Sequence, residues 1–113
     1  MSKHGKSRNE SLMLRYLSET ISYKVSDPSL GIATVTGVEI TNDYSYAKVY
    51  ISFLGDGDVA PKMEILKAAA GFIRHEVAQK MHIRKMPELR FIYDDTLEKA
   101  AKIEEILKRT RKD

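Results

Sequence analysis

The chain has 113 residues, of which 42% are hydrophobic and 31% are charged, and its formal net charge is +3. This length is typical of one domain, so we expect residues 1–113 to fold as a single unit. The sequence contains no cysteine, which excludes disulfides, thiolate metal sites and cysteine nucleophiles. No stretch approaches the roughly 18 apolar residues of a membrane helix, and the first residues lack a signal-peptide pattern. We therefore expect a soluble, cytoplasmic protein without a membrane partner, and we expect it to be a monomer.

The first predicted element is an amphipathic helix. Ser7 and Glu10 fit a capping box, in which the hydroxyl and the carboxylate satisfy backbone amides at a helix start. Apolar side chains then recur every three or four residues, which predicts a helix to about residue 25. The residue before a proline is displaced from helical geometry, so we expect Asp27-Pro28 to end this helix.

Two β-strands are predicted next, over residues 33–40 and 46–53. The apolar parity of the first strand switches at Gly37, which indicates a β-bulge. Turn-forming residues separate the strands, so we expect an antiparallel hairpin. Tyr46 and Tyr50 share one face of the second strand with Lys48. Such tyrosines can stack on unpaired bases, although they more often pack across strands.

A second helical stretch follows, with Pro61 in its first turn and an apolar face that continues to about residue 82. Gly71 lies in the middle of this stretch, where a glycine costs about 1 kcal/mol relative to alanine. It therefore predicts either a kink or a point of close approach.

The last predicted elements are a third strand, opened by Pro87, and a final helix. We expect Asp95 and Glu98 to cap this helix. Its predicted buried face comprises Leu97, Ala100, Ala101, Ile103 and Leu107.

The basic residues gather in three segments, and this distribution is more informative than the small net charge. Residues 1–8 contain three basic residues and no acid, and residues 80–90 contain four against only Glu88. The last six residues contain four against Asp113. We expect residues 1–6 and 109–113 to be flexible basic tails.

The predicted order, α-β-β-α-kink-α-β with an additional C-terminal helix, is that of a type II KH domain, an RNA-binding fold. A KH domain has the motif G-x-x-G at its helix–helix junction, and this sequence reads LKAAAGFIR over 66–74, with Ala69-x-Gly71 instead. Three further stretches carry the same likeness: SDPSLG (26–31) leading into VTGV (35–38), YAKVYIS (46–52) and PELRFIYD (87–94). In these motifs the chain resembles the bacterial ribosome-binding factor A family.

The resemblance implies an α+β fold in which helices cover one face of a three-stranded sheet. It also implies a non-catalytic assembly factor that binds the free 30S ribosomal subunit and 16S rRNA, including the 5′-terminal helix region. Such a factor supports late maturation and 5′-end processing of 16S rRNA, is important at low temperature and has an assembly GTPase as a further partner. The alternative is a KH-like adaptor that binds a protein and does not act through RNA.

The residues that we assign to RNA contact are Ala69, Gly71, Arg74, Lys80, Arg84, Lys85, Arg90, Lys3, Lys6, Arg8, Lys108, Arg109, Arg111 and Lys112. Cations bind phosphates with release of counterions, whereas the alternative for each is a solvated surface charge. For the basic residues at the N-terminus and the C-terminus, a role in solubility explains the charges equally well. For the Ala69-x-Gly71 kink, the alternative is a small-residue patch where two helices cross the sheet.

Enzymatic patterns are weak in this sequence. His75 and His82 are seven residues apart, whereas a zinc-protease pair lies four apart. Asp94 and Asp95 could bind a metal, but helix capping explains them better. We therefore expect no catalytic residue, no metal and no cofactor.

Overall fold

The computed structural model describes residues 3–25, 27–55 and 57–110. Its order of elements confirms the predicted α+β arrangement with an additional C-terminal helix. The elements are α1 (Lys3–Lys24), the short 3-10 helix η1 (Pro28–Leu30), β1 (Ile32–Ile40), β2 (Tyr46–Leu54), α2 (Val59–Ala68), α3 (Ala70–Ala78), β3 (Glu88–Tyr93) and α4 (Thr96–Thr110). Among the described residues, none of these helices is long and apolar enough to cross a membrane.

The three strands form one sheet in the order β1-β2-β3. β1 and β2 pair antiparallel, which confirms the predicted hairpin, and β3 pairs with β2 in parallel. The register shifts between Val35 and Gly37, so the predicted bulge is confirmed. The bulge restores the burial pattern, because Val35 before it and Ile40 after it both face the core.

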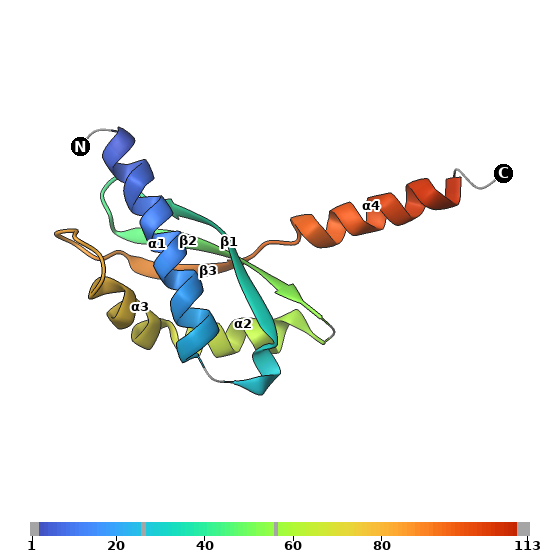
Figure 1. The fold of residues 1–113 in the computed structure, drawn as a ribbon, viewed down its shortest axis with the longest axis horizontal. Helices are drawn as coiled ribbons and strands as arrows, with labels where there is room; N and C mark the ends of the chain where they lie inside the picture. Colours follow the sequence, from blue (N-terminus) through green and yellow to red (C-terminus); the bar gives the residue numbers. More distant parts are fainter. Residues whose placement is uncertain (1–2, 26, 56, 111–113) are drawn as a thin grey trace.

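Helices cover one face of this sheet (Figure 1). Met13 and Leu17 of α1 and Ile73 and Val77 of α3 are fully buried against this face. The strands contribute alternate residues to the same core, among them Val49 and Ile51 of β2. The opposite face of β2 and β3 is exposed or half-buried, and we call its residues the open sheet face: Tyr46, Lys48, Tyr50, Glu88, Arg90 and Ile92.

The beginning of α1 differs from the prediction. The helix already runs from Lys3, so the described part of the expected tail 1–6 is helical and Ser7 lies inside the helix. The predicted capping box is therefore wrong. The Glu10 carboxylate instead accepts a hydrogen bond of 2.8 Å from the backbone amide of Ile40. That contact is long-range in sequence, and a local capping motif could not reveal it.

The C-terminal helix α4 also differs, because it packs against no other helix (Figure 1). Every α4 side chain that the structure describes is exposed, including Ile103 and Leu107, so the predicted buried face is wrong. The first amide of the helix is bound by Asp94 rather than by Asp95 or Glu98: Thr96 N donates to Asp94 Oδ1 at 3.0 Å. The hydroxyls of Thr36 and Thr96 also donate to Asp94, and these bonds hold its pKa below the ordinary value.

Candidate nucleic-acid interface

A groove of about 820 Å³ runs along β3 between the open sheet face and the α2–α3 junction. We call it the sheet groove. Its lining residues are Thr41, Tyr46, Lys48, Lys67, Ala70, Glu88, Leu89, Arg90, Phe91 and Ile92. β3 is an edge strand, so the groove lies where the sheet ends and is open to a large ligand.

The sheet groove is basic, since Lys48, Lys67 and Arg90 face only one acid within it, Glu88. Lys48 and Arg90 are cross-strand partners in the β2–β3 register, so their side chains share one face. Each of the three cations forms an ion pair with a carboxylate: Lys48–Glu39 at 3.9 Å, Lys67–Glu64 at 3.8 Å and Arg90–Glu88 at 3.5 Å. These pairs are exposed and long, so they hold the cations weakly. A phosphate could therefore displace the carboxylates.

An aromatic ring lies beside these charges. The Arg90 guanidinium carbon is 4.4 Å from the ring centroid of Tyr46, a cation–π contact that orients the arginine across the groove. Tyr46 is 39% exposed, whereas Tyr50 is half-buried and packs over Gly37, where an added Cβ would lie 3.7 Å from its ring. The Tyr46 ring is therefore exposed enough to stack on a base, whereas the Tyr50 ring packs across the strands against β1.

The α2–α3 junction borders the groove with small residues. α2 ends at Ala68, Ala69 between the two helices has φ −89° and ψ 0°, and Ala70 begins α3 and lines the groove. Gly71 has an ordinary helical φ, and an added Cβ there would meet no atom within 4 Å. The kink therefore forms at Ala69, and neither strain nor close packing requires the glycine. What Gly71 offers is an exposed backbone, without a side chain between it and a ligand.

Two of the predicted RNA contacts, Arg74 and Lys80, interact with other residues of the chain. Arg74 donates from Nε to the Pro87 carbonyl at 3.0 Å and from Nη2 to the Met86 carbonyl at 2.5 Å. It thus fastens the loop that leads into β3. The Lys80 ammonium lies 5.7 Å from the Tyr16 ring centroid and 3.8 Å from a carboxylate oxygen of α1, so it joins α3 to that helix. The Arg74 bonds stabilise the fold, whereas the Lys80 ion pair is exposed and long and contributes little.

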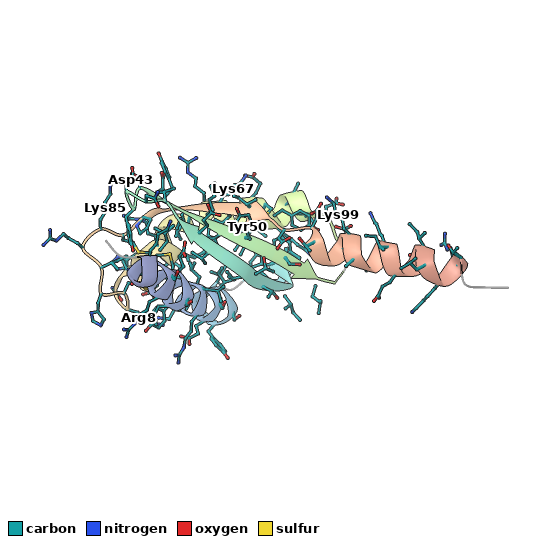
Figure 2. All side chains as sticks on the ribbon, turned by 90° about the horizontal axis from the view of Figure 1, so that it is seen from above. Arg8, Asp43, Tyr50, Lys67, Lys85 and Lys99 are labelled. Atoms are coloured by element: carbon teal, nitrogen blue, oxygen red, sulfur yellow. The ribbon has the colours of Figure 1, made fainter. Side chains whose placement is uncertain are left out.

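A second group of basic residues lies at one end of the molecule, and we call it the polar cluster: Lys6, Arg84 and Lys85. Lys6 Nζ donates to Oδ1 of Asn42 at 2.9 Å, and a cavity of about 450 Å³ is lined by Asn42, Arg84 and Lys85 among others. Figure 2 shows Lys85 beside Asp43 at this end, with Arg8 on the side of α1. The polar cluster and the sheet groove meet at the β1–β2 turn, where Thr41 lines the groove and Asn42 lines the cavity.

Two further predicted contacts lie at the other end of the molecule. Lys108 and Arg109 are exposed on the last turn of α4, where Arg109 pairs with Glu105 at 2.9 Å. The side chain of Lys3 and the residues Arg111 and Lys112 lie outside the part that the structure describes. The predicted contacts that the structure describes are thus spread over several surfaces rather than gathered in one site.

Sequence reasoning missed Lys48 and Lys67 as groove residues. Lys48 could have been found, because it shares the polar parity of β2 with Tyr46. Lys67 gave no such signal, since its position depends on how α2 meets β3. Within residues 3–25, 27–55 and 57–110, no group of three or more His, Cys, Asp and Glu side chains could hold a metal ion.

Comparison with known proteins places the chain in a family. A family model described as ribosome-binding factor A matches residues 5–107. A protein of that name from Desulfitobacterium hafniense is 38% identical over 109 residues, which cover 96% of this chain and 87% of that protein. The crystal structure of ribosome-binding factor A from Thermus thermophilus has a TM-score of 0.72 and 27% identity, covering 79% of this chain and 96% of that one.

Coordinates of the Thermus thermophilus protein have also been fitted into a cryo-EM map of its complex with the 30S subunit. They match this chain with a TM-score of 0.65 and 24% identity, over 83% of this chain and 96% of that one, which shows a shared fold. The family model spans nearly all of the described fold, including the sheet groove and most of α4. The chain belongs to the ribosome-binding factor A family.

Proposed function

We propose that this protein is a non-catalytic assembly factor that binds the free 30S ribosomal subunit through 16S rRNA. The observation that carries the proposal is the sheet groove, which Lys48, Lys67 and Arg90 line together with the exposed ring of Tyr46. Cations hold phosphates and an aromatic face stacks on an unpaired base, and RNA recognition uses both contacts together. The names of the relatives and the fitted 30S complex of the Thermus thermophilus protein support the choice of partner.

The polar cluster is the second proposed contact with RNA. Arg84 has no hydrogen bond or ion pair to another described residue, and Lys85 is likewise exposed in the loop between α3 and β3. Exposed cations such as Arg84 can neutralise phosphates. The β1–β2 turn joins the two sites, because Thr41 lines the sheet groove and the next two residues line the cavity beside Arg84 and Lys85, so one RNA can contact both.

The finer parts of the proposal follow from family membership. They are a role in late maturation and 5′-end processing of 16S rRNA, contact with its 5′-terminal helix region, importance at low temperature and release by an assembly GTPase. Action in the cytoplasm as a monomer belongs to the same proposal.

Sedimentation of purified protein with purified 30S subunits tests the proposal. We expect the protein to co-sediment with 30S subunits at low salt and to be released as salt is raised, because phosphate contacts depend steeply on ionic strength. Added free 16S rRNA should compete with the subunit. If the protein fails to co-sediment at low salt, the proposal is wrong. If binding persists unchanged at high salt and free rRNA does not compete, the protein is an adaptor for a ribosomal protein instead.

A further inference from the structure

The α4 helix carries an apolar stripe that nothing covers in this structure. Ile103 is 58% exposed, Ile106 60% and Leu107 50%. These residues recur at the spacing of one helix face. The charged residues of α4 are largely paired along the helix, as Lys99–Asp95, Lys102–Glu98 and Arg109–Glu105. The helix is therefore amphipathic, with a side suited to packing.

The open sheet face carries apolar surface of the same kind. Tyr46 and Ile92 are 39% and 37% exposed, and Tyr50 is the cross-strand partner of Ile92. β2 and β3 form a parallel pair, and parallel strands are usually covered by helices on both faces. Here the helices α1 to α3 cover one face only, so the parallel pair has room for one more helix (Figure 1).

The lengths of the two surfaces match. α4 follows β3 after only Asp94 and Asp95, so a reversal at these residues would lay the helix back along the strand. Leu107 lies twelve residues beyond Asp95, which is about 18 Å along a helix. Glu88, the cross-strand partner of Tyr46, lies five residues before Tyr93, which is about 17 Å along a strand. A reversed α4 would thus bring Leu107 over Tyr46.

The charges of the two surfaces are mixed. The sheet groove presents Lys48, Lys67 and Arg90. Glu104 borders the apolar stripe of α4 on one side, whereas Lys99 and Lys102 lie on the other side and are paired with Asp95 and Glu98. In the extended position, a backbone bond of 2.8 Å from the Asp94 amide to the Ile51 carbonyl fixes the end of β3, so the reversal would fall after Asp94. Two exposed side-chain bonds also hold the start of α4: Tyr93 Oη donates to Glu98 at 2.7 Å, and the Thr36 hydroxyl donates to Asp94 at 2.7 Å. Water can replace these two exposed bonds, so they hold the extended position only weakly.

We propose that α4 is a lid that folds back onto the open sheet face, covers the sheet groove and competes there with RNA. Three half-exposed aliphatic side chains are a small part of the about 800 Å² that each partner buries in a stable complex, so a second copy of the chain would bind too weakly. The two-residue connection removes this obstacle, because it gives the helix a high effective concentration over its own sheet. The closed and the extended positions then exchange, and RNA selects the extended one. The competition rests on the proposed function, whereas the closure itself does not.

Disulfide trapping tests the closure without RNA. The chain has no cysteine, so a double variant reports a single intended bond. We expect Tyr46→Cys with Leu107→Cys to form an intramolecular disulfide under mild oxidation, at least tenfold faster than Tyr46→Cys with Glu105→Cys. Glu105 is the matched control, because it points away from the stripe on the same stretch of helix. Equal slow rates for the two pairs, or disulfide-linked dimers as the main product, would overturn the lid.

RNA then tests the competition. Excess 16S rRNA should slow disulfide formation in the Tyr46→Cys, Leu107→Cys protein several-fold. In an otherwise unchanged chain, Ile103→Ser with Ile106→Ser and Leu107→Ser should bind 30S subunits two- to tenfold more tightly. If rRNA does not change the rate of disulfide formation and the serine variant binds 30S subunits with the affinity of the parent chain, the proposed competition is wrong. If the double-cysteine variant traps normally but the parent chain, which keeps Tyr46, does not bind 30S subunits, the proposed function is refuted and the closure stands.

Discussion

Glu10 and Ile40 join the first helix to the end of the first strand. The Glu10 carboxylate accepts a 2.8 Å hydrogen bond from the Ile40 amide, and the Ile40 side chain is fully buried. A strand end that faces the core needs a partner for its last amide, because an unpaired buried donor is costly. A residue thirty positions earlier supplies that partner, so α1 and the hairpin depend on each other.

Replacing Glu10 should therefore destabilise the fold. We expect Glu10→Ala to lower the free energy of unfolding by about 1–2 kcal/mol, since the Ile40 amide loses a charged acceptor in a partly buried site. Glu10→Gln keeps a carbonyl acceptor and should lose less than half of that amount. Urea denaturation measures both variants. Equal stability of Glu10→Ala and the parent chain would show that water serves the Ile40 amide equally well.

Two glycines should respond in opposite directions to alanine. Gly71 has helical φ and open space around it, so Gly71→Ala should raise stability by up to about 1 kcal/mol. Gly31 has φ +63° and ψ −142°, a region that side chains rarely adopt, so Gly31→Ala should lower stability by about 1–3 kcal/mol. Thermal unfolding of both variants checks the signs. If Gly71→Ala instead weakens 30S binding while the fold is stabilised, the exposed backbone of Gly71 contacts RNA.

Arg74 should act on stability rather than through RNA. Its guanidinium bonds two successive carbonyls of the loop before β3, and a lysine cannot reach both. Arg74→Lys should therefore cost about 1 kcal/mol of unfolding free energy. Arg84→Lys is the control, because Arg84 has no side-chain hydrogen bond within the described residues and should be neutral. A neutral Arg74→Lys that weakens 30S binding would assign Arg74 to the interface after all.

The β1–β2 turn should lose stability in acid. The Ser45 amide and the Thr41 hydroxyl donate to the Asp43 carboxylate, and these bonds lower the pKa of Asp43 from 3.8 to about 2. A carboxyl whose pKa is depressed by folding stabilises the native state fully above pH 3.8, and the contribution is lost as pH falls towards 2. Carbon-detected NMR titration of the Asp43 carboxyl should give a midpoint near 2. A midpoint near 3.8 would mean that the turn does not hold the carboxylate.

The strands and the packed helices could be predicted from the sequence because their patterns are local. Alternation over 46–53 and the parity switch at Gly37 identify strand faces and the bulge without knowledge of the rest. The failures have one cause. Glu10 bonds a backbone amide of a distant strand, and the apolar face of α4 is exposed although its spacing is that of a buried face. Neither outcome can be read from the neighbouring residues.

The candidate site was predictable only in part for the same reason. Arg90 was found because it lies in a basic segment, whereas Lys48 and Lys67 come to the groove from two other elements. Arg74 has the residue type of an RNA contact but bonds two carbonyls of its own chain, which composition cannot reveal.

The salt dependence of 30S binding by a sheet-groove variant tests the central claim most directly. Lys48→Gln with Lys67→Gln and Arg90→Gln should bind at least tenfold more weakly, and the slope of log K against log salt should fall by about 2 to 3. Arg15→Gln with Lys24→Gln and Lys102→Gln removes the same charge outside the groove and should leave the slope nearly unchanged. If the groove variant keeps both the affinity and the slope of the parent chain, the sheet groove is not the RNA-binding surface.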